Sequence, residues 1–271
     1  MNLPARPREL AITLACALLR PAFRPWRRRA APANPARILV FRRCCLGDVL
    51  MTTPLLAALD RAYPGARITY AAGKWAAAAL AQNPHVDAIL TLPEHPTWRD
   101  WVRIVGRLRR GGYDLAVVPD RSPLPGLALA LAGVPRRVGL DSSGRGFALT
   151  DRATVRGVRH ETDLALDLAR ALGLGDPPRR TTYRPGEAAR ARVARLLADE
   201  RAAGPLFVIH PGGGSNPGVT MDTKRWPPER FAQVADRLVA RHGGAVALAG
   251  AASDRAAAAA TRAAMARAPV D

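Results

Sequence analysis

The sequence predicts an α/β protein in which a parallel sheet forms a first lobe and an incomplete second lobe follows. From residue 37 onward, short apolar segments alternate with helical segments, which is typical of parallel strands covered by helices on both faces. Residues 174–187 then contain three prolines and two glycines, the composition of a linker. After this stretch the alternation begins again and yields only two further strands.

The elements of the first lobe follow from apolar runs and helical patterns. Strands are expected at Ile38–Phe41, Ile68–Ala71, Ala88–Leu92 and Leu115–Pro119. Helices are expected at Val49–Ala62, Trp75–Ala81, Trp98–Arg109 and Leu124–Ala132. A weaker pattern predicts two more strands near Arg137–Leu140 and Phe147–Thr150.

The second series is shorter. Its expected elements are a helix at Glu187–Arg201, a strand at Leu206–His210, a helix at Pro228–His242, a strand at Ala245–Ala249 and a helix at Ser253–Arg267. Two strands with their helices cannot bury both faces of a sheet, and a core of fewer than about 70 residues is marginal. The domain organisation predicted is a basic leader at 1–35, a first lobe at 36–175, a linker with a connecting helix at 176–204 and a partial second lobe at 205–271.

Charge and cysteine content limit the classes of partner. The net charge is +19, and Lys74 and Lys224 are the only lysines, so arginine carries nearly all of it. A GC-rich coding bias explains that skew, but a basic balance also favours nucleotide phosphates, acidic glycolipids or a membrane surface. No nucleic-acid-binding motif is present, so nucleic acid is not expected as a partner.

Cys16, Cys44 and Cys45 form neither a disulfide framework nor a zinc motif, which fits a reducing cytoplasm. The adjacent cysteines are interpreted as packing residues rather than nucleophiles.

The leader carries seven arginines against one acid, Glu9. Its apolar run, Leu10–Leu19, has about half of the roughly 20 residues that a membrane-spanning helix needs. The charges follow the apolar run, unlike those of a signal peptide. Residues 1–35 are therefore interpreted as a basic amphipathic segment on an anionic membrane surface, with a disordered basic tail as the alternative.

A first candidate site lies after the first strand, where Gly47 and Asp48 open a helix. A carboxylate at the carboxyl end of a parallel strand lies where open α/β sheets bind ligands, and it can take a proton from a hydroxyl. The alternative is that Asp48 only caps the helix. Arg42, Arg43 and Asp120 lie near the same edge and are candidate acceptor contacts. The alternatives are that the two arginines face solvent and that Asp120 forms a surface pair with its neighbour Arg121.

A second candidate site follows the strand at 206–210. The glycine run Gly212, Gly213 and Gly214 with Ser215 exposes amides that can bind phosphate oxygens, and Lys224 and Arg225 supply cations before the next helix. Such charges compensate a departing diphosphate. An ordinary surface helix with solvated cations is the alternative. His210 and Ser253 are further candidate contacts, with local hydrogen bonding and helix capping by Ser253 or Asp254 as their alternatives.

Together these segments resemble glycosyltransferase family 9, the ADP-heptose:lipopolysaccharide heptosyltransferases, from about Arg37 to Arg267. The resemblance rests on Arg-Ile-Leu-Val-Phe-Arg at 37–42 with Leu-Gly-Asp-Val-Leu-Met-Thr-Thr-Pro at 46–54, on Asn-Pro-His-Val-Asp at 83–87, and on His-Pro-Gly at 210–212 with Lys-Arg-Trp-Pro at 224–227. It implies two facing Rossmann-like lobes of the GT-B type, the first for the acceptor and the second for the nucleotide sugar. Only part of the second lobe is expected in this sequence.

The resemblance also implies an activity: inverting transfer of heptose from an ADP-activated sugar to a lipopolysaccharide-type or other glycan acceptor. No cofactor and no obligatory metal are expected. Asp48 is then the base that deprotonates the acceptor hydroxyl, and Lys224 contacts the donor phosphates. The enzyme is expected in the cytoplasm, as a peripheral protein of the cytoplasmic face of the inner membrane.

The sequence departs from the family in one respect that concerns the donor. The family's Asp-x-Gly-x-x-His segment, which binds the nucleotide diphosphate, does not occur before Asp271, so the sequence predicts a truncated second lobe. Two alternatives follow: a non-catalytic relative that binds only acceptor, or a nucleotide or phosphate-ester enzyme on a similar scaffold.

Overall fold

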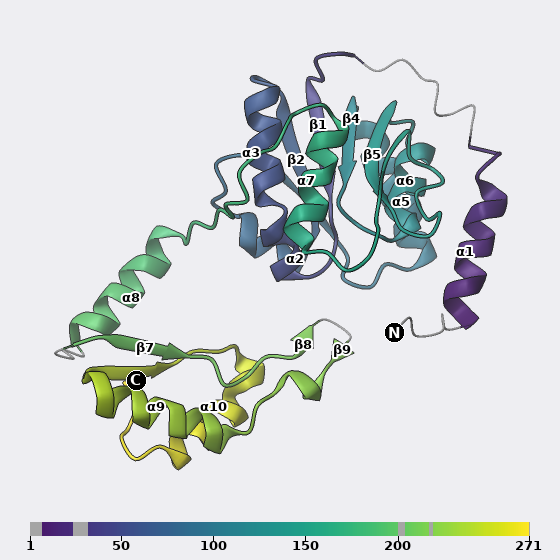
Figure 1. The fold of residues 1–271 in the computed structure, drawn as a ribbon. Coiled ribbons are helices and arrows are strands. Elements are labelled where there is room, and N and C mark those ends of the chain that lie inside the picture. The colour runs from purple at the N-terminus through teal and green to yellow at the C-terminus, as the bar shows by residue number, and fades with distance from the viewer. Residues whose placement is uncertain (1–6, 24–31, 200–203, 217–218, 271) are drawn as a thin grey trace. The chain divides into compact units, whose positions relative to one another are not determined.

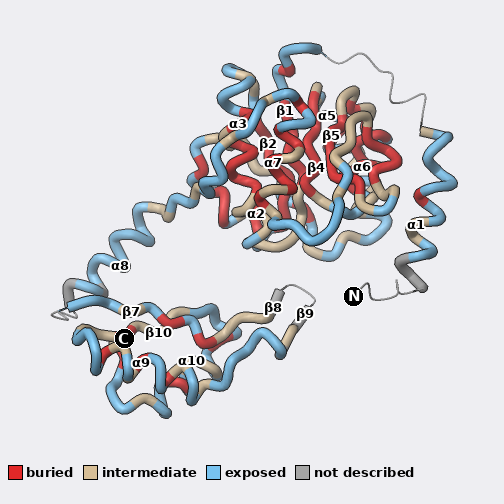
Figure 2. Tube along the Cα trace, viewed as in Figure 1, coloured by how far each residue is buried: buried red, intermediate tan, exposed pale blue. Residues whose placement is uncertain are grey.

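The computed structural model describes residues 7–23, 32–199, 204–216 and 219–270. The chain divides into two compact units, Met1–Arg184 and Pro185–Asp271, and the boundary lies inside the proline-rich stretch at 174–187. Each unit has its own sheet and its own hydrophobic core. Buried residues gather along the sheet of the first unit (Figure 2).

The first unit is built around a six-stranded sheet in the order β3-β2-β1-β4-β5-β6 (Figure 1). All of its strand pairs are parallel. The strands are β1 (Arg37–Phe41), β2 (Arg67–Gly73), β3 (Ala88–Leu92), β4 (Leu115–Val118), β5 (Arg136–Asp141) and β6 (Asp151–Thr154). This arrangement confirms the α/β fold and the first four strands. The strand order reverses at β1, so the carboxyl ends of β1 and β4 form a switch point, the usual ligand site of such sheets.

Helices cover both faces of this sheet, as the continuously apolar strands require. The helices of the first unit are α1 (Pro7–Leu19), α2 (Leu46–Met51), α3 (Thr53–Ala62), α4 (Lys74–Ala77) with the 3₁₀ turn η2 (Ala78–Leu80), α5 (Trp98–Gly111), α6 (Pro123–Leu131) and α7 (Glu161–Ala171). Side chains alternate between the faces of β1. Ile38 and Val40 pack with residues of α3 and α7, and Leu39 and Phe41 pack with residues of α5 and α6.

The helix expected at Val49–Ala62 is divided at Thr52 into α2 and α3. Pro54 has no N–H, so it cannot bond to the carbonyl of Leu50 as a helix would require. The hydroxyl of Thr53 donates to that carbonyl at 2.7 Å, and the hydroxyl of Thr52 donates to the carbonyl of Val49 at 2.7 Å. The break therefore leaves neither carbonyl without a partner.

The strand predicted at Phe147–Thr150 is wrong, because β6 begins only at Asp151. Phe147 and Ala148 lie in a turn and are buried against Ala130 and Cys16, while Leu149 enters the core beneath α5 and α6. Their apolar character reflects burial in a turn and not pairing in the sheet. The sequence analysis also missed α7.

The leader's apolar run forms α1, which packs onto the first unit. Ile12, Cys16 and Phe23 contact a cluster that includes Ala130 and Phe147. The rings of Phe23 and Phe147 meet edge to face, with their centroids 5.2 Å apart. A disordered tail is thus wrong for residues 7–23, while the arginines at 24–29 lie outside the described residues. In the described part of the chain, no helix is long and apolar enough to cross a membrane.

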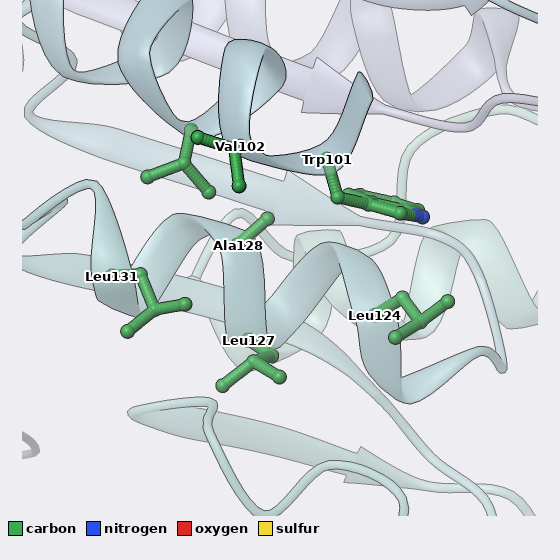
Figure 3. A pocket seen from close by; sticks show the side chains of 7 residues that line it. Trp101, Val102, Leu124, Leu127, Ala128 and Leu131 are labelled. Carbon is green, nitrogen blue, oxygen red and sulfur yellow. The ribbon is translucent and has the colours of Figure 1, made fainter. Parts of the chain in front are cut away.

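An apolar groove of about 400 Å³ runs between α5 and α6 (Figure 3). Its lining residues are Trp101, Val102, Val105, Leu124, Leu127, Ala128 and Leu131. Helix α6 has no charged or polar side chain, so the part of it that α1 and α5 leave uncovered is necessarily apolar. Leu127 also packs against the cluster that receives α1, which makes the groove and the α1 contact continuous.

The second unit is a smaller α/β arrangement in which β7 (Leu206–Ile209) pairs in parallel with β10 (Ala245–Leu248). Its helices are α8 (Glu187–Asp199), α9 (Pro228–His242) and α10 (Arg255–Ala264), with 3₁₀ turns η3 (Asp222–Lys224) and η4 (Ala252–Asp254). The short strands β8 (Ser215–Asn216) and β9 (Val219–Thr220) pair antiparallel. Helix α9 confirms its prediction at both ends. The last helix is shorter than the expected Ser253–Arg267, because η4 precedes it.

Asp254 ties the two loops of this unit together. Its carboxylate accepts hydrogen bonds from the amide of Gly213 at 3.1 Å and from the amide of Ala251 at 2.8 Å. The side chain is buried and packs directly on the Cα of Gly212, where a Cβ would overlap the carboxylate. Gly212 is therefore a glycine because Asp254 occupies the space that a side chain would need.

We expect Gly212→Ala to destabilise the second unit by about 1–3 kcal/mol, since an added methyl group must displace the buried carboxylate. Gly186→Ala is the matched control, because a Cβ there meets no atom within 4 Å and the φ is not positive. Chemical denaturation followed at Trp226 reports on the second unit. Equal midpoints for the two variants would contradict the steric role of Gly212.

Candidate active site

The carboxyl ends of β1 and β4 bring together the charged residues predicted for the first site. Arg42 directly follows β1, and Asp120 lies two residues beyond the end of β4. Asp48 is the third residue of α2 and does not cap it: Cys45 is the capping residue, and no side chain accepts a hydrogen bond there. The capping alternative for Asp48 is therefore wrong, and its carboxylate serves another contact.

That contact is an ion pair with Arg42. Nη2 of Arg42 donates to Oδ2 of Asp48 at 2.6 Å. The guanidinium is nearly buried, with 12% of its side chain exposed, whereas 34% of the Asp48 side chain is exposed. The carboxylate is thus held from the protein side and remains open to a ligand. Pairing with a buried arginine of fixed position also orients the carboxylate.

The remaining nitrogens of Arg42 hold the main chain around the switch point. Nε donates to the carbonyl of Cys44 at 3.3 Å, and Nη1 donates to the carbonyl of Pro119. One side chain therefore connects the loop after β1, the end of β4 and the first turn of α2. Arg42 is a positioning residue in this structure, and the predicted solvent-facing alternative for it is wrong.

A second carboxylate approaches Arg42 from α7. Oε2 of Glu161 lies 3.6 Å from Nη2 of Arg42, and Oε1 of Glu161 accepts a hydrogen bond from Arg121. Glu161 is the first residue of α7, and the ring of the preceding residue, His160, caps that helix by accepting from the amide of Thr162 at 3.2 Å. Sequence reasoning missed Glu161 together with α7.

Electrostatics keep the guanidinium of Arg42 charged. Burial lowers the pKa of the Arg42 guanidinium, but the carboxylates of Asp120, Asp48 and Glu161 outweigh that effect and raise the pKa above its usual value. Asp120 itself accepts a hydrogen bond from the amide of Ser122 at 2.8 Å. Three acids around one buried arginine can orient the hydroxyl groups of a sugar acceptor or receive a proton from one.

Arg43 lies apart from this cluster. Its guanidinium donates to the carbonyl of Glu94, and its own carbonyl accepts from the amide of Gly73 at 2.8 Å. These bonds join the loop after β1 to β2 and to the loop after β3. The structure does not bring Arg43 to Asp48, so its predicted acceptor contact remains a prediction.

In the second unit, the glycine loop differs from the expected cradle of free amides. The amide of Gly213 is bonded to Asp254, and the carbonyl of Gly213 accepts from Nε of Arg225 at 3.0 Å. Gly213 and Gly214 have φ values of 99° and 75°, which explains the need for glycine at both positions. The loop is thus built around Asp254, which the sequence suggested as a helix cap. Its side chain accepts from the amide of Ala251 at the start of η4 but makes no cap bond to α10.

The cations predicted for this loop do lie beside it. Arg225 contacts it directly, and the exposed Lys224 ends the turn η3. The amide of Met221, the residue before η3, donates to the carbonyl of Gly214 at 2.7 Å. Nε2 of His210 lies 3.5 Å from Oδ2 of Asp254. Ser253 is exposed in the turn η4, whereas the side chain of Ser215 lies outside the described residues.

Asp254 places a negative charge near His210 and Arg225 at this loop. Hydrogen bonds from the amides of Ala251 and Gly213 lower the pKa of its carboxyl, and His210 and Arg225 lower it further, against the opposing effect of burial. A phosphate at this loop would therefore depend on Lys224 and Arg225 for compensating charge. Across the described residues, no three metal-ligating side chains gather into a group.

Comparison with known proteins identifies the family to which this chain belongs. The sequence model of glycosyltransferase family 9 (heptosyltransferase) matches residues 101–269. The lipooligosaccharide heptosyltransferase 2 of Haemophilus ducreyi is 28% identical over 232 residues, which cover 81% of this chain and 64% of that protein. The chain thus spans less than two thirds of the length of this curated relative.

Solved structures share the fold. A glycosyltransferase family 9 structure from Veillonella parvula aligns with a TM-score of 0.73 and 21% identity, covering 89% of this chain and 70% of that one. The structure of the Escherichia coli ADP-heptose lps heptosyltransferase II aligns with a TM-score of 0.64 and 24% identity, covering 84% and 69%. The two-unit α/β architecture is therefore that of the GT-B heptosyltransferase structures. Since the family's sequence pattern extends over more than half of the chain, this protein belongs to glycosyltransferase family 9.

Proposed function

We propose that this protein is an inverting glycosyltransferase that moves heptose from ADP-heptose to a lipopolysaccharide-type acceptor. The family supports glycosyl transfer, and the names of the similar enzymes from Haemophilus ducreyi and Escherichia coli support heptose and the ADP-linked donor. The observation that carries the proposal is the partly exposed carboxylate of Asp48, fixed at the switch point of the sheet by Arg42.

In this mechanism, Asp48 removes the proton from an acceptor hydroxyl while the oxygen attacks the anomeric carbon of the donor. Arg42 holds the carboxylate in position, and Glu161 and Asp120 border the acceptor site. The bond from the sugar to ADP breaks as the new glycosidic bond forms, so the configuration inverts. Lys224 and Arg225 compensate the charge that develops on the leaving diphosphate. We propose that no cofactor or obligatory metal takes part.

Asp48→Asn keeps the shape of the side chain but removes its ability to accept the proton. We expect kcat for acceptor-dependent ADP release to fall by roughly 10²–10⁴-fold, the usual contribution of a general base. Asp176→Asn is the matched control, because 80% of the Asp176 side chain is exposed on the surface. A loss below about threefold in Asp48→Asn would exclude this role.

The same assay separates the competing functions. A protein that binds only acceptor releases no ADP from ADP-heptose whether or not acceptor is present. A phosphate-ester enzyme on this scaffold releases product without any sugar acceptor. The proposal requires that ADP release depend on both the donor and the lipopolysaccharide-type acceptor.

Lys224 offers a clean test of donor binding, since the chain has one other lysine. We expect Lys224→Ala to raise the Kd for ADP about tenfold or more, the effect of losing one charge-assisted contact to phosphate. Lys74→Ala, at the exposed start of α4, removes the same charge elsewhere and should leave the Kd unchanged. Isothermal titration with ADP measures both, and equal Kd values would remove Lys224 from the donor site.

We also propose that the protein lies peripherally on the cytoplasmic face of the inner membrane. Leu10, Leu14 and Leu18 follow one another at four-residue spacing on α1 and are 54%, 64% and 79% exposed. This leucine ridge is on the side of α1 opposite to Ile12 and Cys16, which pack onto the protein. Seven arginines in the first 35 residues provide the attraction to anionic headgroups that such an apolar ridge requires.

We expect Leu14→Ser with Leu18→Ser to reduce co-sedimentation with phosphatidylglycerol vesicles, because the apolar area that enters the interface is lost. Binding of the unchanged protein should weaken as salt is raised. Val193→Ser with Leu197→Ser is the matched control, since it makes the same change at four-residue spacing on exposed positions of α8. Equal sedimentation of the two double variants would contradict contact through the ridge.

A further inference from the structure

Two cysteines lie in the loop that leads into α2, and their sulfur atoms touch. Sγ of Cys44 is 2.7 Å from Sγ of Cys45, and both side chains are half-buried. Cys45 has a φ of 70°, in the left-handed region that side chains rarely adopt. Neither residue belongs to a hydrophobic cluster of the described chain, whereas Cys16 does. Both lie in the loop after β1, outside these clusters, so their interpretation as loop packing residues stays a prediction.

We propose that Cys44 and Cys45 form a dithiol modification site that peroxides oxidise reversibly to a disulfide, and that this oxidation displaces Asp48. The site is chemically distinct from the sugar-transfer chemistry. The effect on activity rests on the proposed role of Asp48, but formation of the disulfide does not. The strained φ of Cys45 serves to bring the two sulfurs together.

The two thiols have different roles in the proposed oxidation. Burial raises the pKa of the Cys45 thiol to about 12, with the hydrogen bond to Cys44 and the charge of Asp48 adding to that effect. This shift makes Cys45 the poorer attacker of peroxide, since the thiolate is the nucleophile, and we assign the first step to Cys44. The Cys44 sulfur attacks one peroxide oxygen, the O–O bond breaks, and a sulfenic acid and water form.

Cys45 completes the reaction because its sulfur already lies in contact with that of Cys44. It attacks the sulfenic sulfur, the S–O bond breaks, and the hydroxide leaves as water with the proton of the Cys45 thiol. Two thiols and one hydrogen peroxide thus give one disulfide and two waters. The thiols lose two electrons, which the peroxide takes up, and a thiol reductant reverses the change.

Closing this ring must move the main chain. Consecutive Cα atoms are about 3.8 Å apart across a trans peptide, whereas disulfides usually join Cα atoms about 4.4–6.8 Å apart. The affected carbonyls both serve the site: that of Cys44 accepts from Nε of Arg42, and that of Cys45 accepts from the amide of Val49 at 2.9 Å in the first turn of α2. Movement of either carbonyl therefore shifts Asp48 relative to Arg42. The strain also makes such a disulfide easy to reduce.

The test treats the full chain with hydrogen peroxide and measures three quantities. Thiols titrated in denaturant should fall from the three cysteines of the sequence to one, which peptide mass analysis should assign to Cys16. The peptide carrying Cys44 and Cys45 should be lighter by two hydrogens and return to its original mass with dithiothreitol. Hydrogen exchange at the amide of Val49 should be faster in the oxidised protein.

Cys16→Ser is the control that keeps the pair, and it should lose both remaining thiols. Cys45→Ser should form no intramolecular disulfide and should keep its Val49 exchange rate unchanged by peroxide. Retention of both thiols in the unchanged protein, or sulfinic acid formation at equal rates with and without Cys45, would overturn the site. A disulfide that forms without changing exchange at Val49 would overturn the coupling to Asp48. All three readouts are independent of glycosyl transfer.

Discussion

The guanidinium of Arg42 is the interaction on which the first candidate site depends. It is nearly buried at the switch point between β1 and β4, and it contacts Asp48, Glu161 and the carbonyls of Cys44 and Pro119. A buried charge is tolerated only when it is paired and hydrogen-bonded, and here every partner belongs to a different segment of the chain. The position of each of these segments is therefore tied to one side chain. Lysine could not replace it, because a single ammonium group cannot span these partners in the fixed fork of arginine.

Much of the fold could be read from the sequence because the relevant signals are local. The apolar runs of β1 to β4 and the helical pattern of α9 needed no tertiary information. The turn at Phe147–Thr150 could not be read in this way, since burial beneath α1 and α6 gives a turn the same apolar composition as a strand. Helix α7 could have been predicted from the sequence, because Leu164, Leu168 and Leu172 recur at four-residue spacing. They follow an acidic first turn that contains Glu161 and Asp163.

The candidate sites were predictable in residue type and less so in contacts. Asp48 was found because a carboxylate after a first strand has a general meaning in α/β sheets. Its partner Arg42 was named only as an acceptor contact, since sequence spacing does not reveal which way a side chain turns. The glycines at 212–214 indicated a loop close to a ligand, but the group that they approach in the structure is Asp254, which lies about 40 residues later. Contacts of this range depend on the fold and not on local pattern.

The division between α2 and α3 has a mechanical consequence for Asp48. Val49 is the one side chain of α2 that is buried, whereas most of α3 is fixed in the core. The hydroxyls of Thr52 and Thr53 satisfy the carbonyls at the junction, both residues are buried, and the hydroxyl of Thr52 also bonds to that of Tyr70 at 2.8 Å. The short α2 thus starts from a buried, fully hydrogen-bonded junction, and the direction in which Asp48 leaves it is set by this break as well as by Arg42.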